Sequence, residues 1–506
     1  MGRLYKNVLY NILGQGIVLA LGFVGVKFIF SRLGPDVFGI IFFSQVLTGV
    51  LTTALELGVL STTVREVSAY FDSDFEYVRH LIKTASVFYW GLSVVLYAAV
   101  FLAAPFLVEH WINLRTIDPG TATAMLRILA VTLLIMLPRA LYSSIFQGRQ
   151  RMELNNSIDV GASALQQVGI IAVLAAGGNV FEVVSWIAAS ATVSTLTYMS
   201  VAARLVGWRS LVPRYFPDVV RRNIHFTSHM SVLSVISILQ MQFDKVVVSK
   251  LLPVASVGYY SFASTVVVRI SFASNAIAQA ALPSFARLHR QGDPRPLLLQ
   301  YRKLQDLICF GLVPIFAAAC FGAIPLFTYL FSRSTSSLLL LPMALLCLGF
   351  YMSGTINVPY TFSVAVGQPQ IASRANFVAL VIVLPITTGL IYFFGLVGAG
   401  SSWVVYYLFL YVYMIPKICS RCLEVKVWTW YGHVGKVLLL AALTYGLLWL
   451  LVVVPHGYST PAIVVSYVAG SIVFLVGAFA LIGPDLRETI SSLPRRYLLH
   501  NATTAS

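Results

Sequence analysis

The chain has 506 residues, of which 58% are hydrophobic and only 10% are charged, and its mean hydropathy is +0.84. A soluble domain typically carries about 25% charged residues, so these values exclude a soluble globular protein. They predict a membrane protein with many spans. In a soluble protein a net charge of +16 would suggest a nucleic-acid partner. In a membrane protein its interpretation depends on which segments carry the charges.

Apolar runs long enough to cross a bilayer recur along the whole chain, and a spanning helix needs about 20 such residues. The first run follows Arg3 and Lys6, and no small-x-small cleavage site follows it, so it is interpreted as an uncleaved span rather than a signal peptide. Barrel strands would be shorter and would alternate in polarity, so the predicted fold is all-α. About fourteen spans are predicted, at residues 8–31, 36–62, 84–108, 123–146, 158–177, 183–206, 226–250, 256–282, 305–331, 337–362, 372–394, 397–417, 433–453 and 461–482.

The basic residues follow the positive-inside rule. With the N-terminus placed inside, 26 of the 34 Lys and Arg residues fall in inner segments, Arg139 among them, and only five fall in outer segments. The remaining three, Lys27, Lys245 and Arg269, lie within predicted spans. This bias predicts that both termini are cytoplasmic. It also accounts for the basic charge, so nucleic acid is excluded as a partner.

Two segments of the chain repeat one pattern. KFIFSRLGPDVFG begins at Lys27, and KVVVSKLLPVASVG begins at Lys245, 218 residues later. The offset equals six spans, which preserves orientation and predicts a parallel repeat of two six-span lobes. The predicted organisation is an N-lobe at 1–206, a cytoplasmic linker at 207–224, a C-lobe at 225–417, and two extra spans with a cytoplasmic tail at 418–506.

Three predicted spans carry polar residues on one helical face, as the lining of an internal cavity would. These stripes are Gln45, Thr52 and Glu56 in the second span, Asp159, Ser163 and Gln166 in the fifth, and Ser237, Gln240 and Asp244 in the seventh. Hydrogen bonding between packed helices is the alternative explanation for the Ser, Thr and Gln residues. Glu56 could also pair with a cation or carry a transported proton.

The three cations within spans differ in depth. Lys27 and Lys245 each lie about one turn from the outer end of a span, so snorkelling to the interface remains an alternative to a binding role. Arg269 lies roughly thirteen residues from either interface, so it needs a buried partner, a wet cavity or an anionic ligand. Glu56 and Asp159 are the candidate partners for a buried ion pair.

The sequence contains none of the signatures that would indicate catalysis. It lacks a P-loop and an H-E-x-x-H helix, and its longest outer loop, 109–122, is too short for a catalytic domain. Cys419 and Cys422 form a single C-x-x-C without the second pair or the His that a zinc site needs. We therefore expect no enzymatic activity, no metal and no cofactor.

Several motifs resemble those of a known transporter group: SRLGPDVFGIIFFSQ (31–45), FQGRQRMELNN (146–156), FDKVVVSKLLPVASVGYYSFAS (243–264), ALPSFARLHRQGD (281–293) and YRKLQDL (301–307). The chain resembles, over about residues 1–485, the Wzx-type O-antigen and exopolysaccharide flippases. These belong to the multidrug/oligosaccharidyl-lipid/polysaccharide exporter superfamily, which also contains the multidrug (MATE) transporters. One departure lies in the second span, where Glu56-Leu57-Gly58 stands in place of an Asp-x-Gly.

The resemblance implies an undecaprenyl-diphosphate-linked oligosaccharide as substrate, turned by alternating access from the cytoplasmic to the periplasmic leaflet of a bacterial inner membrane. The product would serve lipopolysaccharide or exopolysaccharide synthesis, with a polysaccharide polymerase and a chain-length regulator as further partners beside the membrane lipids. The expected substrate-binding residues are Arg269, Lys27 and Lys245 for the diphosphate, and Gln45, Glu56, Asp159, Gln166, Gln240 and Asp244 in the cavity. The alternatives are a multidrug/cation antiporter of the same superfamily and a scaffold that transports nothing.

Overall fold

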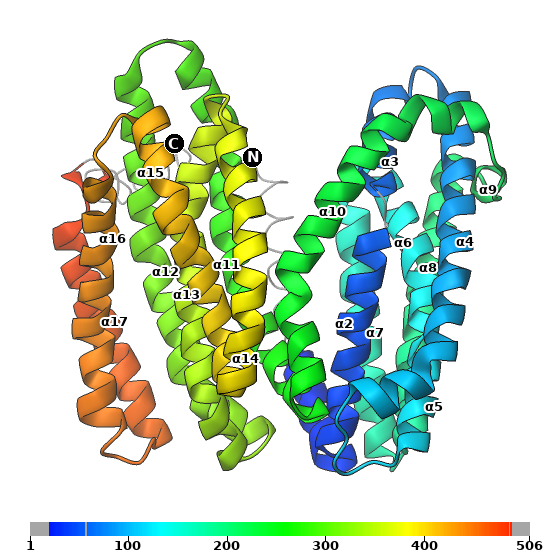
Figure 1. Cartoon of the computed structure of the whole chain (residues 1–506), viewed down its shortest axis with the longest axis horizontal. Helices are drawn as coiled ribbons and strands as arrows, with labels where there is room; N and C mark the ends of the chain where they lie inside the picture. Colours follow the sequence, from blue (N-terminus) through cyan, green and yellow to red (C-terminus); the bar gives the residue numbers. More distant parts are fainter. Residues whose placement is uncertain (1–19, 56–57, 485, 488–506) are drawn as a thin grey trace, which may run out of the picture. The chain divides into compact units, whose positions relative to one another are not determined.

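The computed structural model describes residues 20–55, 58–484 and 486–487, almost all of them helical (Figure 1). A helix over 20–33 comes first. The first half of the chain continues with α2 (Pro35–Leu55), α3 (Val59–Tyr70), α4 (Phe75–Phe106), η1 (Leu107–Trp111), α5 (Pro119–Leu129), α6 (Val131–Gly148), α7 (Met152–Ala175), α8 (Val180–Val206), α9 (Trp208–Leu211) and α10 (Pro217–Leu251). The second half contains α11 (Val254–Arg290), α12 (Pro294–Leu330), α13 (Arg333–Ala365), α14 (Pro369–Tyr413), α15 (Ile415–Ile418), η2 (Cys419–Leu423), α16 (Val427–Ala441), η3 (Ala442–Gly446), η4 (Trp449–Val453) and α17 (Thr460–Leu481).

The predicted helical membrane architecture is confirmed. Eleven helices within the described ranges are long and apolar enough to cross a bilayer. The three other predicted spans fall on the helix 20–33, on α10, and on the second half of α14. In α14 the backbone leaves helical geometry at Gly395 (φ 57°, ψ −130°), between the predicted spans 372–394 and 397–417. A helix of 45 residues would be about 68 Å long, so it must turn back to stay within a hydrocarbon core of about 30 Å.

The predicted span 36–62 is not one continuous helix. Helix α2 ends at Leu55 and α3 begins at Val59, after Gly58 in the left-handed conformation (φ 64°). A glycine adopts this conformation without the steric cost that a side chain would add. The predicted site residue Glu56 falls at this break, outside the described residues.

Short polar motifs mark where several helices begin. The Asp74 side chain accepts a hydrogen bond from the Tyr77 N–H at the start of α4, and Asp118 does the same for Thr121 N at the start of α5. At the start of α8, Asn179 and Glu182 form a reciprocal capping box. These bonds satisfy N–H groups that have no partner inside the helix.

Contacts divide the chain into two compact units, Met1–Ser261 and Phe262–Ser506. In the first unit, α6 packs against α3, α4 and α8, and α10 packs against α2 and α3. The predicted lobes at 1–206 and 225–417 have a different boundary, and the internal repeat stays a prediction. Lys27 and Lys245 both belong to the first unit.

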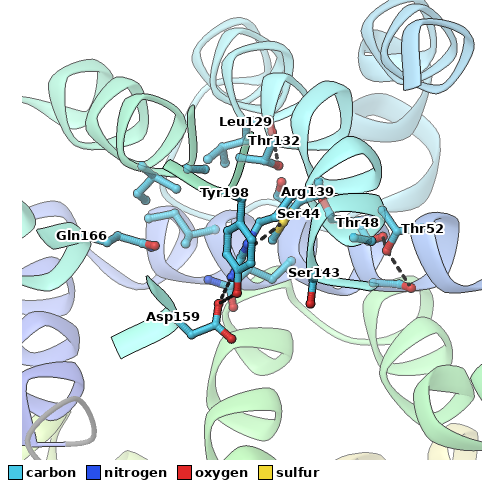
Figure 2. Close-up of a pocket in the computed structure, with 17 residues that line it drawn as sticks. Ser44, Thr48, Thr52, Leu129, Thr132, Arg139, Ser143, Asp159, Gln166 and Tyr198 are labelled. Carbon is cyan, nitrogen blue, oxygen red and sulfur yellow. Dashed lines mark hydrogen bonds and ion pairs between the residues drawn. The ribbon is translucent and has the colours of Figure 1, made fainter. Parts of the chain in front are cut away.

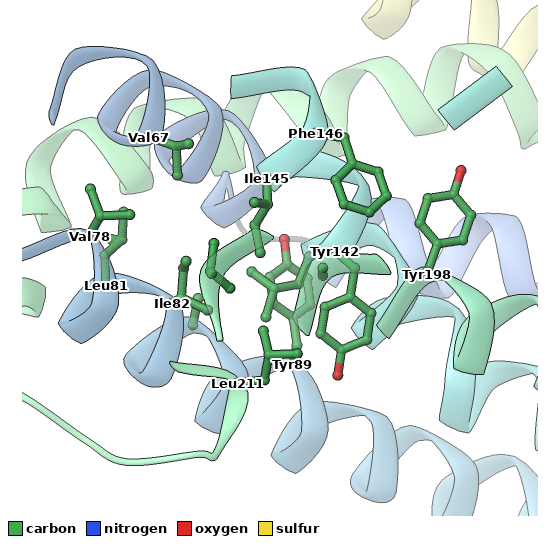
Figure 3. Packing of buried hydrophobic residues seen from close by; sticks show 14 of the residues in the cluster. Val67, Val78, Leu81, Ile82, Tyr89, Tyr142, Ile145, Phe146, Tyr198 and Leu211 are labelled. Carbon is green, nitrogen blue, oxygen red and sulfur yellow. The ribbon is translucent and has the colours of Figure 1, made fainter. Parts of the chain in front are cut away.

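The core of the first unit is built from aliphatic and aromatic side chains of α4, α6 and α8 (Figure 3). Tyr89, Tyr142, Phe146 and Tyr198 are its largest fully buried members. The rings of Phe146 and Tyr198 stack with their centroids 5.7 Å apart. This packing fixes the ring of Tyr198, whose hydroxyl group reaches the polar cavity described below.

At one end of the first unit, glycines let α2 and the start of α11 approach each other closely. A Cβ atom added at Gly39 would lie 2.2 Å from the Val254 carbonyl oxygen, and one at Gly258 would lie 2.5 Å from the ring of Phe38. Asn113, in the α4–α5 connection, forms a β-bridge with Pro253. We call residues 36–39, 113–116 and 249–258 the glycine seam.

Asp36 organises the glycine seam. Its side chain is 1% exposed, and its Oδ2 atom accepts hydrogen bonds from the backbone N–H groups of Arg115 and Thr116, each at 2.6 Å. Hydrogen bonds to a charged group contribute roughly 1.5–3 kcal/mol each. The carboxylate therefore holds the α4–α5 connection against the start of α2.

Replacing Asp36 with Ala should lower the midpoint of thermal unfolding of the detergent-solubilised protein by several degrees, because both N–H groups lose their acceptor. Asp36→Asn should recover part of the loss, since an amide oxygen can still accept. Asp74→Ala is the matched control: it removes a carboxylate that caps an exposed helix start. An Asp36→Ala protein as stable as the control would contradict the assignment.

The second unit is organised around α13, which packs against α12 and α14. In an 18-residue apolar stretch of α13, 72% of the residues are buried. The corresponding share is 22% in residues 427–453 and 28% in α17. Helices α16 and α17, the two extra spans of the sequence prediction, pack on α12 at the edge of the unit (Figure 1).

Candidate functional site

The first unit contains a polar cavity of about 510 Å³ between α2, α5, α6, α7 and α8 (Figure 2). Its polar lining consists of Ser44, Gln45, Thr48, Thr52, Thr132, Arg139, Ser143, Asp159, Gln166 and Tyr198. Polar side chains at this density are costly inside a membrane protein unless they hydrogen-bond to one another or to a ligand. The cavity is therefore the leading candidate for a binding site.

An ion pair and a tyrosine form the charged part of the cavity. Arg139 Nη2 contacts Asp159 Oδ1, and Tyr198 Oη donates a hydrogen bond of 2.9 Å to the same oxygen (Figure 2). The Arg139 guanidinium also lies over the Tyr198 ring, 5.2 Å from its centroid. Asp159 thus links α7 to α6 and α8.

The Arg139 side chain is held in place, but only some of its hydrogen-bond donors have a partner. Besides the bond to Asp159, its Nη1 atom donates only to the weak acceptor Met136 Sδ, at 3.5 Å. A guanidinium has five N–H donors, so three have no partner among the described residues. With 24% of the side chain exposed, Arg139 can donate to a ligand in the cavity.

The rest of the polar lining is neutral. Gln45 is exposed and Gln166 half-buried, and both contribute amide groups to the cavity. The hydroxyl groups of Thr52 and Thr132 donate to backbone oxygens of Thr48 and Leu129, so their lone pairs remain as acceptors. Since the charges of Arg139 and Asp159 cancel, the described cavity offers hydrogen-bond donors and acceptors with little net charge.

The sequence prediction missed Arg139, because the charge count assigned it to an inner segment. The structure places it inside α6, nine residues before the helix ends at Gly148, or about 14 Å along the axis. A residue at that depth cannot belong to the solvated end of the span. The signal was present in the sequence, since the predicted span 123–146 already contained this arginine.

Of the predicted site residues, Gln45, Asp159 and Gln166 line one cavity. Three others lie together on α10, still within the first unit. Asp244 is buried, and its Oδ2 atom accepts a hydrogen bond of 2.6 Å from Tyr260 Oη. Lys245 Nζ donates to Gln242 Oε1 at 3.1 Å, and Gln240 is half-buried. None of the three lines the cavity of Figure 2.

The remaining predicted cations lie elsewhere. Lys27 is half-buried on the helix 20–33. Arg269 lies on α11 in the second unit, is exposed, and has neither an ion pair nor a hydrogen bond to any residue that the structure describes. Asp159, one of the two candidate partners predicted for Arg269, pairs with Arg139. The other candidate partner, Glu56, lies outside the described residues.

Comparison with known structures identifies the fold. The chain is similar to lipid II flippase MurJ in an inward closed conformation, with a TM-score of 0.69, 13% identity, and 97% and 100% of the two chains covered. It is also similar to an inward-facing multidrug resistance MATE family transporter of the MOP superfamily, with a TM-score of 0.61, 15% identity, and 81% and 98% coverage. The protein therefore has the MATE/MOP-like membrane transporter fold.

Sequence comparison then identifies the family. Residues 4–289 match the model of the polysaccharide biosynthesis protein family, and the chain belongs to this family. It is 22% identical over 435 residues to a Shigella flexneri protein assigned as an O-antigen transporter, with 82% of this chain and 98% of that protein covered. The resemblance identified from the motifs is confirmed at the level of family and superfamily.

Proposed function

We propose that this protein is a flippase for undecaprenyl-diphosphate-linked oligosaccharide repeat units. It would turn them from the cytoplasmic to the periplasmic leaflet of a bacterial inner membrane, by alternating access and without a catalytic step. Both termini would lie in the cytoplasm. The observation that carries the proposal is the polar cavity of the first unit, in a chain that belongs to a polysaccharide biosynthesis family.

The cavity has the chemistry that an oligosaccharide requires. Moving a hydroxyl group into an apolar medium without a hydrogen bond costs roughly 2–7 kcal/mol, and each sugar carries several hydroxyl groups. Amides such as Gln45 and Gln166 both donate and accept, so they can replace the water around a glycan in either orientation. The unused donors of Arg139 add a charged contact that a sugar oxygen can accept.

The diphosphate needs net positive charge, which the Arg139–Asp159 pair does not supply. We propose that Arg269, with Lys27 and Lys245, provides it. Arginine binds phosphate oxygens through two parallel N–H bonds and stays charged at any working pH. The exposure of Arg269 and its lack of a bond to any described residue support this role.

The antiporter alternative is weaker because of how the carboxylates are engaged. A site for cationic drugs would use carboxylates that are open to the ligand. Asp159 already accepts bonds from Arg139 and Tyr198, and Asp244 accepts one from Tyr260. The similarity to MATE transporters concerns the fold and does not favour their substrates.

Deletion of the gene tests the proposed function. The expected result is loss of surface polysaccharide together with accumulation of lipid-linked repeat units on the cytoplasmic face, reversed by the wild-type gene. Normal polysaccharide combined with sensitivity to cationic drugs would instead support the antiporter.

Arg269 variants test the diphosphate contact. Arg269→Ala should reduce export about tenfold or more, as loss of a hydrogen bond to a charged group predicts, while the protein remains abundant in the membrane. Arg269→Lys should retain part of the export, because the charge remains and the planar fork is lost. Arg269→Glu should be inactive, because it repels an anion.

Arg287→Ala is the matched control for Arg269, since Arg287 is an exposed arginine in the last turn of the same helix. It should leave export unchanged. Full export by a normally abundant Arg269→Ala protein would refute the assignment of this residue and leave the assignment of the cavity in place.

A further inference from the structure

Another polar cavity, of about 460 Å³, lies in the second unit, and part of its lining belongs to the YRKLQDL motif (301–307). Helix α12 forms one wall, the start of α16 forms another, and the chain that follows α17 completes it. It lies at the end of the unit where α12 and α16 begin. Its polar lining consists of Tyr301, Arg302, Lys303, Gln305, Asp306, Thr429, Trp430 and His433.

Besides His433 Nε2, which faces the Asp306 carboxylate, three buried polar atoms in this lining have no hydrogen bond to any described residue. They are Tyr301 Oη, Gln305 Oε1 and Trp430 Nε1, and their residues are 7%, 4% and 5% exposed. The Tyr301 and Trp430 groups lie near each other, without forming a hydrogen bond of normal geometry. A buried polar atom without a partner destabilises a protein by roughly 1–3 kcal/mol. Three such atoms around one cavity indicate that it is shaped for a polar occupant.

The charges show which sign the occupant carries. Arg302 and Lys303 bring two cations to the cavity, and Asp306 is the only acidic residue among the described residues of its lining. The Asp306 carboxylate is already engaged: Oδ2 accepts a hydrogen bond of 2.9 Å from Gly483 N, and Oδ1 lies 3.3 Å from His433 Nε2. The donors without a partner therefore act together with a surplus of positive charge.

We propose that this cavity binds the phosphate group of a membrane lipid. Tyr301 Oη and Trp430 Nε1 would donate to the phosphate oxygens, and Arg302 and Lys303 would neutralise its charge. The acceptor Gln305 Oε1 fits a headgroup that also carries a donor, such as the hydroxyl groups of phosphatidylglycerol.

The position of the cavity favours a lipid over a soluble phosphate. It lies where spanning helices begin. Trp428, near the start of α16, is 78% exposed, and exposed tryptophans are typical of the interface between membrane and water. Beyond it, α16 exposes apolar side chains such as Leu439 (59%), and Leu443 (54%) does so in η3. Acyl chains of a lipid held by its headgroup can lie along this surface.

Native mass spectrometry of the full-length protein in lipid-free detergent tests the proposal. The probes are short-chain phosphatidylglycerol, short-chain phosphatidylcholine, which lacks headgroup donors, and inorganic phosphate. We expect phosphatidylglycerol to bind most tightly. Tyr301→Phe and Arg302→Gln should each weaken it about tenfold, the effect expected for losing one charge-assisted hydrogen bond. Trp430→Phe removes the second donor, Trp430 Nε1, and keeps an aromatic ring in its place.

Arg295→Gln is the matched control, because Arg295 is exposed on the first turn of α12 and outside the cavity. If Arg295→Gln weakened lipid binding as much as Arg302→Gln, the effect would come from the surface charge of the protein and not from the cavity. That result would overturn the proposal. Unchanged lipid binding by correctly folded Tyr301→Phe and Arg302→Gln proteins would also overturn it. Inorganic phosphate that binds as tightly as the lipid, with the same dependence on the variants, would confirm the phosphate site and refute the lipid as its source.

Discussion

A disulfide between residues 113 and 253 should stop polysaccharide export, and reduction should restore it. The bridge between Asn113 and Pro253 joins the α4–α5 connection to the α10–α11 turn, and the Val254 N–H donates to the Asn113 carbonyl at 3.0 Å. Bridged backbones lie about 4.8 Å apart, within the range that a disulfide spans. If alternating access opens the glycine seam, a covalent bond across it arrests the cycle.

Export by the Asn113→Cys/Pro253→Cys protein is measured before and after a reductant is added, so the reduced protein is the control for the cross-linked one. The two single-cysteine variants and the oxidised wild type exclude effects of the substitutions and of the native cysteines, none of which belongs to the glycine seam. Disulfide formation is measured by protection from maleimide. Full export by a completely cross-linked protein would show that the seam stays closed during transport.

Loss of Arg139 should have the second large effect. Arg139→Ala removes the donors that we assign to the glycan and leaves Asp159 with Tyr198 as its remaining partner inside the membrane. Export should fall at least tenfold, because a charged hydrogen-bond donor contributes roughly 1.5–3 kcal/mol. Some loss of membrane abundance is also expected, since one partner of an ion pair is left alone.

The neutral double variant Arg139→Gln/Asp159→Asn separates binding from folding. It removes both charges together, so membrane abundance should recover while export stays low. Normal export by this variant would show that the pair only holds the helices together. Arg149→Ala is the matched control, since it breaks a surface ion pair with Asp72 at the end of the same helix and should change little.

The sequence predicted the spans because apolar length is a local property of the chain. It also located the turn in α14, between residues 394 and 397, where Gly395 interrupts the helix. The break at Gly58 was missed, because a single left-handed glycine leaves an apolar run looking continuous. Helix boundaries that depend on one dihedral angle are not visible in composition or periodicity.

The candidate site was predicted in part, for a related reason. Helical spacing was enough to select Gln45, Asp159 and Gln166, because residues on one face of a helix share one environment. The partner of Asp159 depends on how α6 and α7 pack, which spacing within one helix does not contain. The same limit hid the cavity around Tyr301, whose lining comes from segments far apart in the sequence.

The glycine seam bears on how fast the protein can change shape. Where α2 crosses the turn at Val254, glycine lets backbone lie against backbone, so no side chains interlock at the closest point. Parting the two backbones at this point breaks only short-range contacts, but opening the whole seam also moves the buried Phe38 ring away from Gly258 and breaks the hydrogen bonds of Asp36. The Asp36 hydrogen bonds at one edge of the seam therefore favour its closed state and slow its opening, so they set how often the seam opens.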